Sequence, residues 1–132
     1  MLNDQLSYDF ASNIPCICYA TSNLSAGIWK HSRSDALTES YLQFNHANLI
    51  KYVVFDLDYE GAVLAWYDNN LPPPLWTAKN PKNGRAHICY KLAVPVCSSD
   101  LGRAEPLKYL AAIQSAFTQK LKADGAYVGL IC

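Results

Sequence analysis

Two aspartates, Asp56 and Asp58, are the residues of this sequence best suited to carry chemistry. They end the segment 51–58 (KYVVFDLD), whose alternation predicts a strand. Residues two apart on a strand share a face, with Cα atoms roughly 6.5–7 Å apart, so the two carboxylates repel each other unless a cation relieves them. We therefore expect both to be ligands of Mg²⁺ or Mn²⁺. The pair alone fits a polymerase-type site, a phosphatase and a glycosyltransferase, with two solvated carboxylates as the alternative.

His87 is the second candidate, and it lies in the segment 86–93 (AHICYKLA), which also predicts a strand. His87 and Lys91 share one face of this strand, while the apolar residues of the other face are expected to pack against helices. If the strand lies beside that of the aspartates, His87 faces the same space as the carboxylates. His87 is then either catalytic or structural, and Lys91 is either a phosphate contact or a solvated lysine.

A long loop is predicted for residues 71–85 (LPPPLWTAKNPKNGR), which are rich in proline and contain an Asn-Gly pair. Its basic residues surround a tryptophan, and a basic cluster also occurs at residues 30–33 (KHSR). Contact with single-stranded nucleic acid requires charges for phosphates and a ring for stacking, although solubility alone also explains basic loops. The nucleic-acid-binding candidates are Lys30, Arg33, Trp76, Lys79 and Lys82.

Asp124 is a third acidic candidate because it follows the longest expected helix, at about residues 105–123. An Asp-Gly pair is common in a helix-to-strand turn, so Asp124 is either a turn residue or a third metal ligand. Gly125 is expected to terminate the helix. The apolar stripe of this helix consists of Leu107, Leu110, Ile113, Phe117 and Leu121.

The expected elements alternate between helices and strands and predict an α+β fold. A two-layer arrangement follows, with the helices packed on one face of a sheet and the other face free to carry chemistry. Inward packing is expected of Val63, Trp66 and Tyr67. The predicted helices are 34–44, 60–68 and 105–123, and the predicted strands are 51–58, 86–93 and 126–132, with 13–20 (NIPCICYA) as an added strand.

The composition fits one domain over residues 1–132. The chain has 11 Lys+Arg against 11 Asp+Glu and is 51% hydrophobic, which excludes disorder and a globally basic nucleic-acid binder but allows a local basic groove. No apolar run approaches the ~20 residues of a membrane span, and the N-terminus does not resemble a signal peptide, so we expect a cytoplasmic protein without membrane contact. Five cysteines with no secretory signal predict buried free thiols in preference to a zinc site.

Taken together, the motifs resemble the Rep proteins of colicin-type theta plasmids, a replicase family of the archaeo-eukaryotic primase superfamily. The resemblance covers roughly residues 20–131 and is most specific where DxD is followed by NPxNGxAHxxYxL and then LxADxxYxGL. The matching stretches are 41–45 (YLQFN), 54–58 (VFDLD), Trp66 with 71–72 (LP), 80–84 (NPKNG), 86–92 (AHICYKL), 95–96 (PV), and 121–124 (LKAD) with Tyr127 and Gly129.

The resemblance implies a primase-polymerase core built on an RRM-like sheet. By analogy, Asp56 and Asp58 hold the catalytic metals, with Asp124 as the third acidic residue, and His87 contacts the phosphates of the incoming nucleotide. Arg85 stands where family members often carry a second histidine, so a basic donor is retained. The nucleotide-binding set implied in this way is His87, Lys91 and Arg85.

The implied function is the initiation of plasmid replication, by synthesis of a short primer from nucleoside triphosphates on single-stranded DNA at the plasmid origin. A host DNA polymerase is the implied partner. We expect the chain to be the catalytic front part of a longer replicase, without the origin-binding C-terminal region. Two alternatives are an inactive nucleotide- or DNA-binding remnant of a replicase and a haloacid-dehalogenase-like phosphatase, although FDLDYEG lacks the hydroxyl or valine that the latter normally has two residues after its second aspartate.

Overall fold

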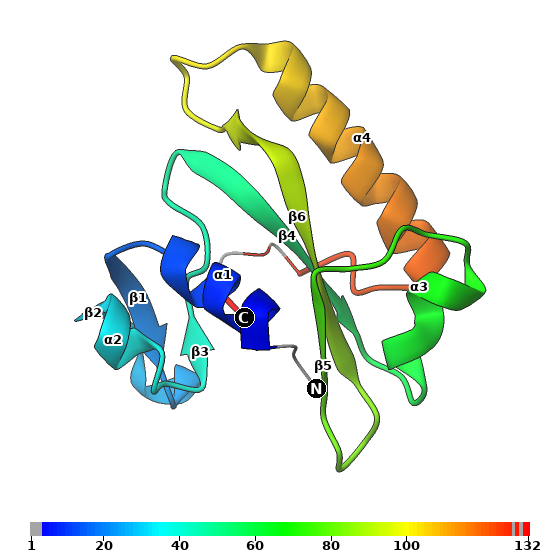
Figure 1. The fold of residues 1–132 in the computed structure, drawn as a ribbon, viewed down its shortest axis with the longest axis horizontal. Helices are drawn as coiled ribbons and strands as arrows, with labels where there is room; N and C mark the ends of the chain where they lie inside the picture. The colour runs from blue at the N-terminus through cyan, green and yellow to red at the C-terminus, as the bar shows by residue number, and fades with distance from the viewer. Residues whose placement is uncertain (1–3, 128, 130) are drawn as a thin grey trace.

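The computed structural model describes residues 4–127, 129 and 131–132 and has an α+β fold with two small antiparallel sheets (Figure 1). None of the helices in these residues is long and apolar enough to cross a membrane. The elements, with η for 3-10 helices, are α1 (Asp4–Asn13), β1 (Ile17–Thr21), η1 (Leu24–Ala26), β2 (Trp29–Ser32), α2 (Arg33–Ala36), β3 (Tyr41–Leu42), β4 (Leu49–Leu57), η2 (Ala62–Leu64), α3 (Ala65–Asp68), β5 (Trp76–Lys79), β6 (Ala86–Cys97) and α4 (Ala104–Leu121).

The central sheet has the strand order β4-β6-β5 and contains both strands that were expected to carry chemistry. In β4, alternate side chains face α4, and they are joined by the apolar face of β6. Because strand side chains alternate between faces, the intervening residues of both strands, Asp56 and His87 among them, lie on the opposite face. The predicted strands 51–58 and 86–93 are confirmed, and β6 continues four residues further, to Cys97.

Helix α4 packs along one face of the central sheet, as the apolar stripe predicted (Figure 1). Leu110 and Leu121 are buried, and the ring of Phe117 stacks on Phe55 with 5.8 Å between centroids. The helix ends at Lys122, which adopts the left-handed conformation with φ 52°, so the prediction that Gly125 would terminate it is wrong by a few residues.

The opposite face of the central sheet is partly covered, which corrects the expectation of a free face. Helix α1 lies against it, and Phe10 packs edge-on against Tyr52 and Trp76 with centroids 5.0 and 5.3 Å apart. Ile14 and Cys89 belong to the same core. At the end of this face that carries Asp56 and His87, the two side chains keep 25% and 30% relative exposure.

The N-terminal sheet has the order β2-β1-β3, and its central strand β1 is the added strand expected within residues 13–20. The C-terminal segment is bound to it, because Leu42 and Cys132 exchange two backbone hydrogen bonds of 3.0 Å. The predicted final strand 126–132 falls partly on residues 128 and 130, which lie outside the described residues. Residues 126 and 127 are not in a strand.

Three local predictions are corrected. The expected helix 34–44 is the single turn α2, followed by β3, because Ser32 caps the helix by accepting from the amide of Asp35 and the chain then pairs with β1. The helix 60–68 is split into η2 and α3, and Tyr67 is 69% exposed and does not pack inward. The loop 71–85 contains strand β5, which pairs with β6.

Candidate active site

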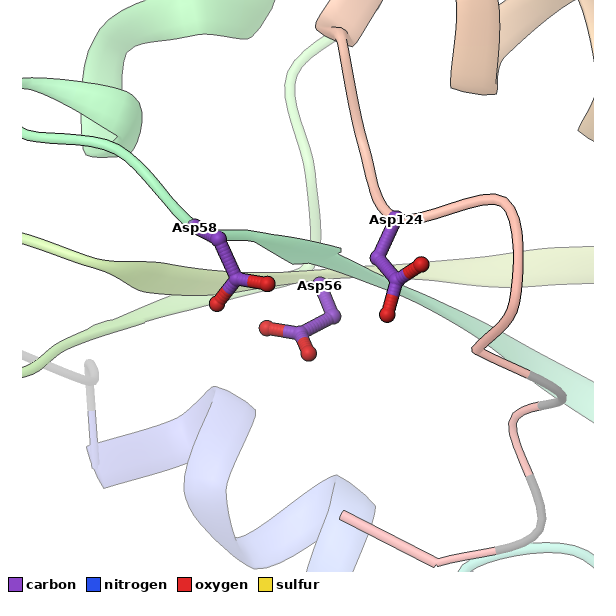
Figure 2. Close-up of side chains that lie close together, drawn as sticks. All are labelled: Asp56, Asp58 and Asp124. Atoms are coloured by element: carbon purple, nitrogen blue, oxygen red, sulfur yellow. The ribbon is translucent and has the colours of Figure 1, made fainter.

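Three carboxylates meet at the partly exposed end of the central sheet (Figure 2). Asp56 is near the end of β4, Asp58 follows that strand, and Asp124 comes from the segment after α4, although it is 66 residues further along the chain than Asp58. One oxygen from each residue lies within 4.8 Å of the others. Oxygen ligands at this spacing, brought together from two elements, suit a hard divalent cation.

Two backbone hydrogen bonds fix the position of Asp124. Its amide donates to the carbonyl of Asp56 over 2.8 Å, and its Oδ1 accepts from the amide of Ala126 over 2.8 Å. The second bond is the side-chain turn expected of an Asp-Gly pair. Asp124 is therefore a turn residue whose carboxylate also belongs to the acidic cluster, so the two interpretations of the sequence are compatible.

His87 lies directly opposite Asp56 across the β4–β6 pairing. Its Nε2 is 3.3 Å from Oδ1 of Asp56, and the ring of Tyr127 stacks on the imidazole with 5.9 Å between centroids and 29° between planes. The Tyr127 hydroxyl in turn donates to the carbonyl of Ile131 over 2.5 Å. The turn that places Asp124 thus also holds an aromatic ring against His87.

The electrostatics of the cluster favour an added positive charge. Burial raises the pKa of Asp56 above its ordinary value of 3.8, His87 opposes this shift, and the negative charges of Asp58 and Asp124 add to it. A carboxylate that is partly desolvated beside two others is stabilised in its ionised form when a cation binds.

The hairpin that joins β5 to β6 brings a basic residue to the cluster. The guanidinium of Arg85 lies 3.8 Å from Asp58, with both side chains more than half exposed, so this ion pair is weak and exchangeable. Lys79 and Lys82 are exposed on the same hairpin. The turn requires Gly84, because its φ is +73° and a Cβ there would lie 3.0 Å from Glu60.

Comparison with protein families gives a match to the model of the Replicase family over residues 13–132, almost the whole chain. The chain belongs to the Replicase family. No curated protein and no solved structure matches it. Membership indicates a function in replication, in agreement with the replicase resemblance of the sequence.

Two of the residues expected to contact nucleic acid have structural roles in this replicase. Trp76 is 8% exposed in β5, where its ring packs against Phe10, so it cannot stack on a base from this position. Arg33 begins α2 and donates to the carbonyl of Ile14 over 2.7 Å. Lys30 lies on β2, with its ammonium 5.7 Å from the centre of the Tyr19 ring, away from the acidic cluster.

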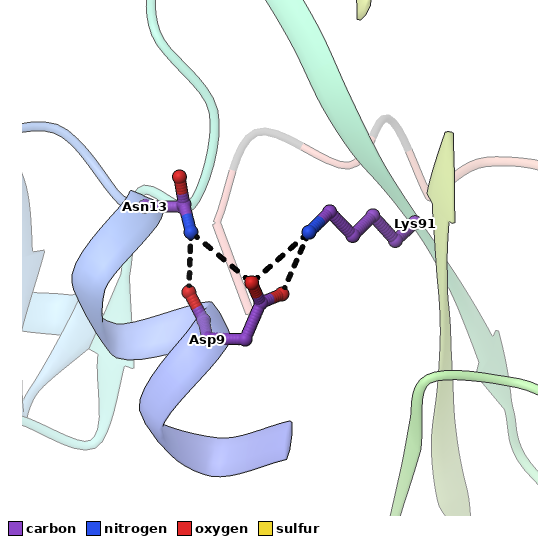
Figure 3. A network of polar contacts seen from close by, with 3 residues as sticks. All are labelled: Asp9, Asn13 and Lys91. Carbon is purple, nitrogen blue, oxygen red and sulfur yellow. Dashed lines mark hydrogen bonds and ion pairs between the residues drawn. The ribbon is translucent and has the colours of Figure 1, made fainter. Parts of the chain in front are cut away.

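Lys91 shares the face of His87 as expected, but its ammonium is held by the N-terminal helix (Figure 3). Its Nζ lies 3.0 Å from both carboxylate oxygens of Asp9, and Asn13 donates to the Asp9 carbonyl over 2.7 Å. Buried Cys89 lies between Lys91 and His87 on the same face of β6. Lys91 therefore fastens α1 to the central sheet and is separated from the carboxylates.

The sequence interpretation gave no role to Tyr127 or to α1. Tyr127 was part of a matching motif, but only the turn after α4 places its ring on His87. For the pairing of Asp9 with Lys91, 82 residues away, the sequence carries no local signal.

Proposed function

We propose that this replicase is a metal-dependent, primase-type nucleotidyltransferase that makes a short primer from nucleoside triphosphates on single-stranded DNA at a plasmid origin. One observation carries the proposal: three carboxylates within 4.8 Å of one another lie beside a histidine in a chain of the Replicase family. In this proposal the reaction takes place in the cytoplasm, and a host DNA polymerase extends the primer.

Asp56, Asp58 and Asp124 would hold Mg²⁺ or Mn²⁺. The donor set fits these ions, because it offers only carboxylate oxygens and places the partly buried Asp56 beside two further carboxylates. When bound, a divalent ion supplies neutralisation of the triphosphate charge and makes the attacking hydroxyl more acidic.

The remaining residues of the site would bind and orient the phosphates. His87 keeps 30% of its side chain exposed next to Asp56, so a phosphate held at the carboxylates is within reach of its imidazole. Arg85 is exposed beside Asp58 and can exchange its weak ion pair for a phosphate oxygen. A positioned donor at the leaving pyrophosphate stabilises the charge that develops in the transition state.

The β5–β6 hairpin would contact the template. Lys79 and Lys82 are exposed on it, and the hairpin reaches the carboxylates through Arg85, which lies beside Asp58. Phosphate contacts of this kind position a strand without reading its sequence. A primer-making enzyme has to accept many template sequences, and the hairpin offers no exposed aromatic ring for base contact, since Trp76 is buried.

Incorporation of labelled ribonucleotide into short products on single-stranded DNA, with Mn²⁺ or Mg²⁺, tests the proposal. We expect products from the wild type and none from Asp56→Asn, while Asp100→Asn, which removes an exposed carboxylate before α4, keeps full activity. Phosphate release from a simple phosphomonoester would instead indicate a phosphatase. Binding of metal and nucleotide without product would indicate a remnant that has lost catalysis.

A further inference from the structure

A cavity of about 900 Å³ lies between β4 and the second half of α4, next to the acidic cluster. Its wall includes Asp124, so the cavity begins where the cluster ends. Tyr127 and Phe44 line the same space. This volume lies within the range of pockets that enclose small ligands and is several times that of a phosphate group.

The helical wall of the cavity is polar and, apart from Lys122 at the end of the helix, uncharged. Gln114, Ser115, Thr118 and Gln119 line it from α4 at the spacing of neighbouring turns. Gln43 lines it from the segment before β4. Amide side chains both donate and accept hydrogen bonds, as the edges of nucleobases and the hydroxyls of a sugar do. The uncharged part of this wall therefore suits a neutral group with many polar atoms, and Lys122 at the end of the helix is the only positive charge that α4 adds to the cavity.

The strand wall adds a backbone donor and acceptor. Strand β4 is at the edge of the central sheet, and the amide and carbonyl of Tyr52 point outward, where Asn45 bonds both, over 3.0 and 2.7 Å. The carbonyl of Asp56 also points outward, to the amide of Asp124. Because outward and inward residues alternate along an antiparallel strand, the amide and carbonyl of Val54 point the same way, into the cavity.

The partner strand supports this orientation of Val54. Its neighbour across the pairing, Cys89, accepts from the amide of Leu75 over 2.8 Å on the far side of β6. The pair of Val54 and Cys89 is thus a non-hydrogen-bonded pair of the β4–β6 ladder. Within the described part of the chain, the amide and carbonyl of Val54 make no hydrogen bond outside that ladder. An adjacent donor and acceptor on a flat edge match the edge of a planar heterocycle.

We infer that this cavity binds the base and sugar of a nucleotide whose phosphates lie at Asp56, Asp58 and Asp124. The inference rests on the proposed function and deepens it, because it makes a nucleoside triphosphate, in preference to a bare phosphoester, the ligand of the site. Asp124 is the link, since it lines the cavity and belongs to the cluster. The neutral part of the ligand meets the uncharged part of the wall, and the charged part meets the metal-binding carboxylates.

The test compares the affinities of ATP and inorganic tripolyphosphate in the presence of Mn²⁺, measured by calorimetry. Ser115→Leu places a larger apolar side chain in the cavity and favours the helix, so folding is retained. Ala116→Leu is the matched control, because this exposed neighbour on α4 does not line the cavity. Gln114→Leu is a second variant that removes an amide at similar size.

We expect wild type to bind ATP more tightly than tripolyphosphate. Because pocket contacts are lost, Ser115→Leu should lower the affinity for ATP about tenfold or more, and Gln114→Leu should lower it about threefold or more. Both variants should keep the wild-type affinity for tripolyphosphate. Three outcomes would overturn the cavity assignment and leave the metal site intact. They are equal affinity of the wild type for the two ligands, unchanged ATP affinity in both variants, and a loss of ATP affinity in Ala116→Leu as large as in the cavity variants. A wild type that binds neither ligand would overturn the proposed function and the inference with it.

Discussion

The amide of Asp124 donates a 2.8 Å hydrogen bond to the carbonyl of Asp56, which fastens the segment after α4 to the edge of β4. Together with the bond from the Ala126 amide to Oδ1 of Asp124, this contact positions the third carboxylate of the cluster. The turn that follows Asp124 in the sequence brings the ring of Tyr127 over His87. The acidic cluster therefore depends on the docking of α4 on the central sheet. Asp56 and Asp58 lie at the end of β4, and Asp124 comes from the segment that follows α4.

The first prediction separates the charge of Asp124 from its role in the turn. Asparagine keeps an oxygen that accepts from the amide of Ala126 and loses the negative charge. Because one charged ligand is lost, Asp124→Asn should lower Mn²⁺ affinity about tenfold. Its melting temperature should stay within a few degrees of that of the wild type. Calorimetry with Mn²⁺ and thermal unfolding measure the two effects.

Asp124→Ala is the matched variant, because it removes the turn acceptor as well as the charge. It should lose Mn²⁺ affinity to the same extent and be about 1 kcal/mol less stable than Asp124→Asn, the usual net value of one hydrogen bond. Unchanged Mn²⁺ affinity in both variants would remove Asp124 from the metal site.

The second prediction concerns the pH dependence of folding without metal. Since burial raises the pKa of Asp56, the folded protein holds a proton on this group in a pH range where the unfolded chain has released it. The free energy of unfolding therefore falls as pH rises from the ordinary pKa of 3.8 through the raised value, and stays lowered above it. Asp56→Asn should be more stable than wild type above that range.

Urea unfolding from about pH 4 to about pH 8 measures this difference. Near the acidic end the two proteins should have similar stability, and the advantage of Asp56→Asn should grow with pH. Addition of Mn²⁺ should stabilise the wild type at neutral pH by mass action, with little effect on the variant. A stability difference that does not change with pH would show that Asp56 has the same pKa in the folded and unfolded chain.

The strongest periodic patterns were sufficient to predict the central part of the fold. The strands 51–58 and 86–93 and the helix 105–123 are long enough for period and hydrophobicity to agree, and they brought Asp56 and His87 to one face as expected. Strand β5 was missed because three consecutive prolines end two residues before it begins, while its four residues are held by pairing with β6, a tertiary contact.

The cover over the second sheet face was not predictable in the same way. Helix α1 spans only ten residues, and its position depends on Phe10 fitting between Tyr52 and Trp76, which are more than 40 residues away in sequence. The same packing changes the role assigned to Trp76. In the sequence it is an aromatic residue among lysines and prolines, and in the structure it is part of a core.

The third prediction follows from that difference. Trp76→Ala should destabilise the protein by about 3–5 kcal/mol, the usual cost of truncating a buried aromatic residue. Trp76→Phe should lose less stability and bind single-stranded DNA like wild type, because the ring does not reach solvent. Fluorescence anisotropy with a single-stranded oligonucleotide measures DNA binding, and urea unfolding measures stability. Weaker DNA binding by a folded Trp76→Phe would contradict the structural role.

The fourth prediction concerns the two exposed lysines of the β5–β6 hairpin. For a single strand, each neutralised phosphate contributes about −0.7 to the slope of log affinity against log salt concentration. Replacing Lys79 and Lys82 together with alanine should therefore weaken binding of single-stranded DNA and make the slope shallower by about 1.4 if each contacts one phosphate. Lys108→Ala with Lys120→Ala, two exposed lysines on α4, is the matched control and should leave the slope unchanged.

The fifth prediction distinguishes the two basic residues of β6 and its hairpin that were expected to bind nucleotide. Lys91 is occupied by Asp9 on the far side of Cys89, whereas Arg85 is next to Asp58 at the acidic cluster. Arg85→Met should therefore lower the affinity for ATP with Mn²⁺ about tenfold, as expected for the loss of a charge-assisted contact, and Lys91→Met should leave it unchanged.

Lys91→Met should act on α1 instead. Loss of a partly exposed ion pair costs about 0–1 kcal/mol of global stability, but it should speed local opening of α1 and so increase hydrogen exchange at Phe10 and Ile14. Asp9→Asn removes the same ion pair from the other side and should give the same exchange pattern. If Lys91→Met weakened ATP binding while Asp9→Asn did not, Lys91 would have to leave Asp9 to meet the nucleotide, and its assignment as an anchor of α1 would be wrong.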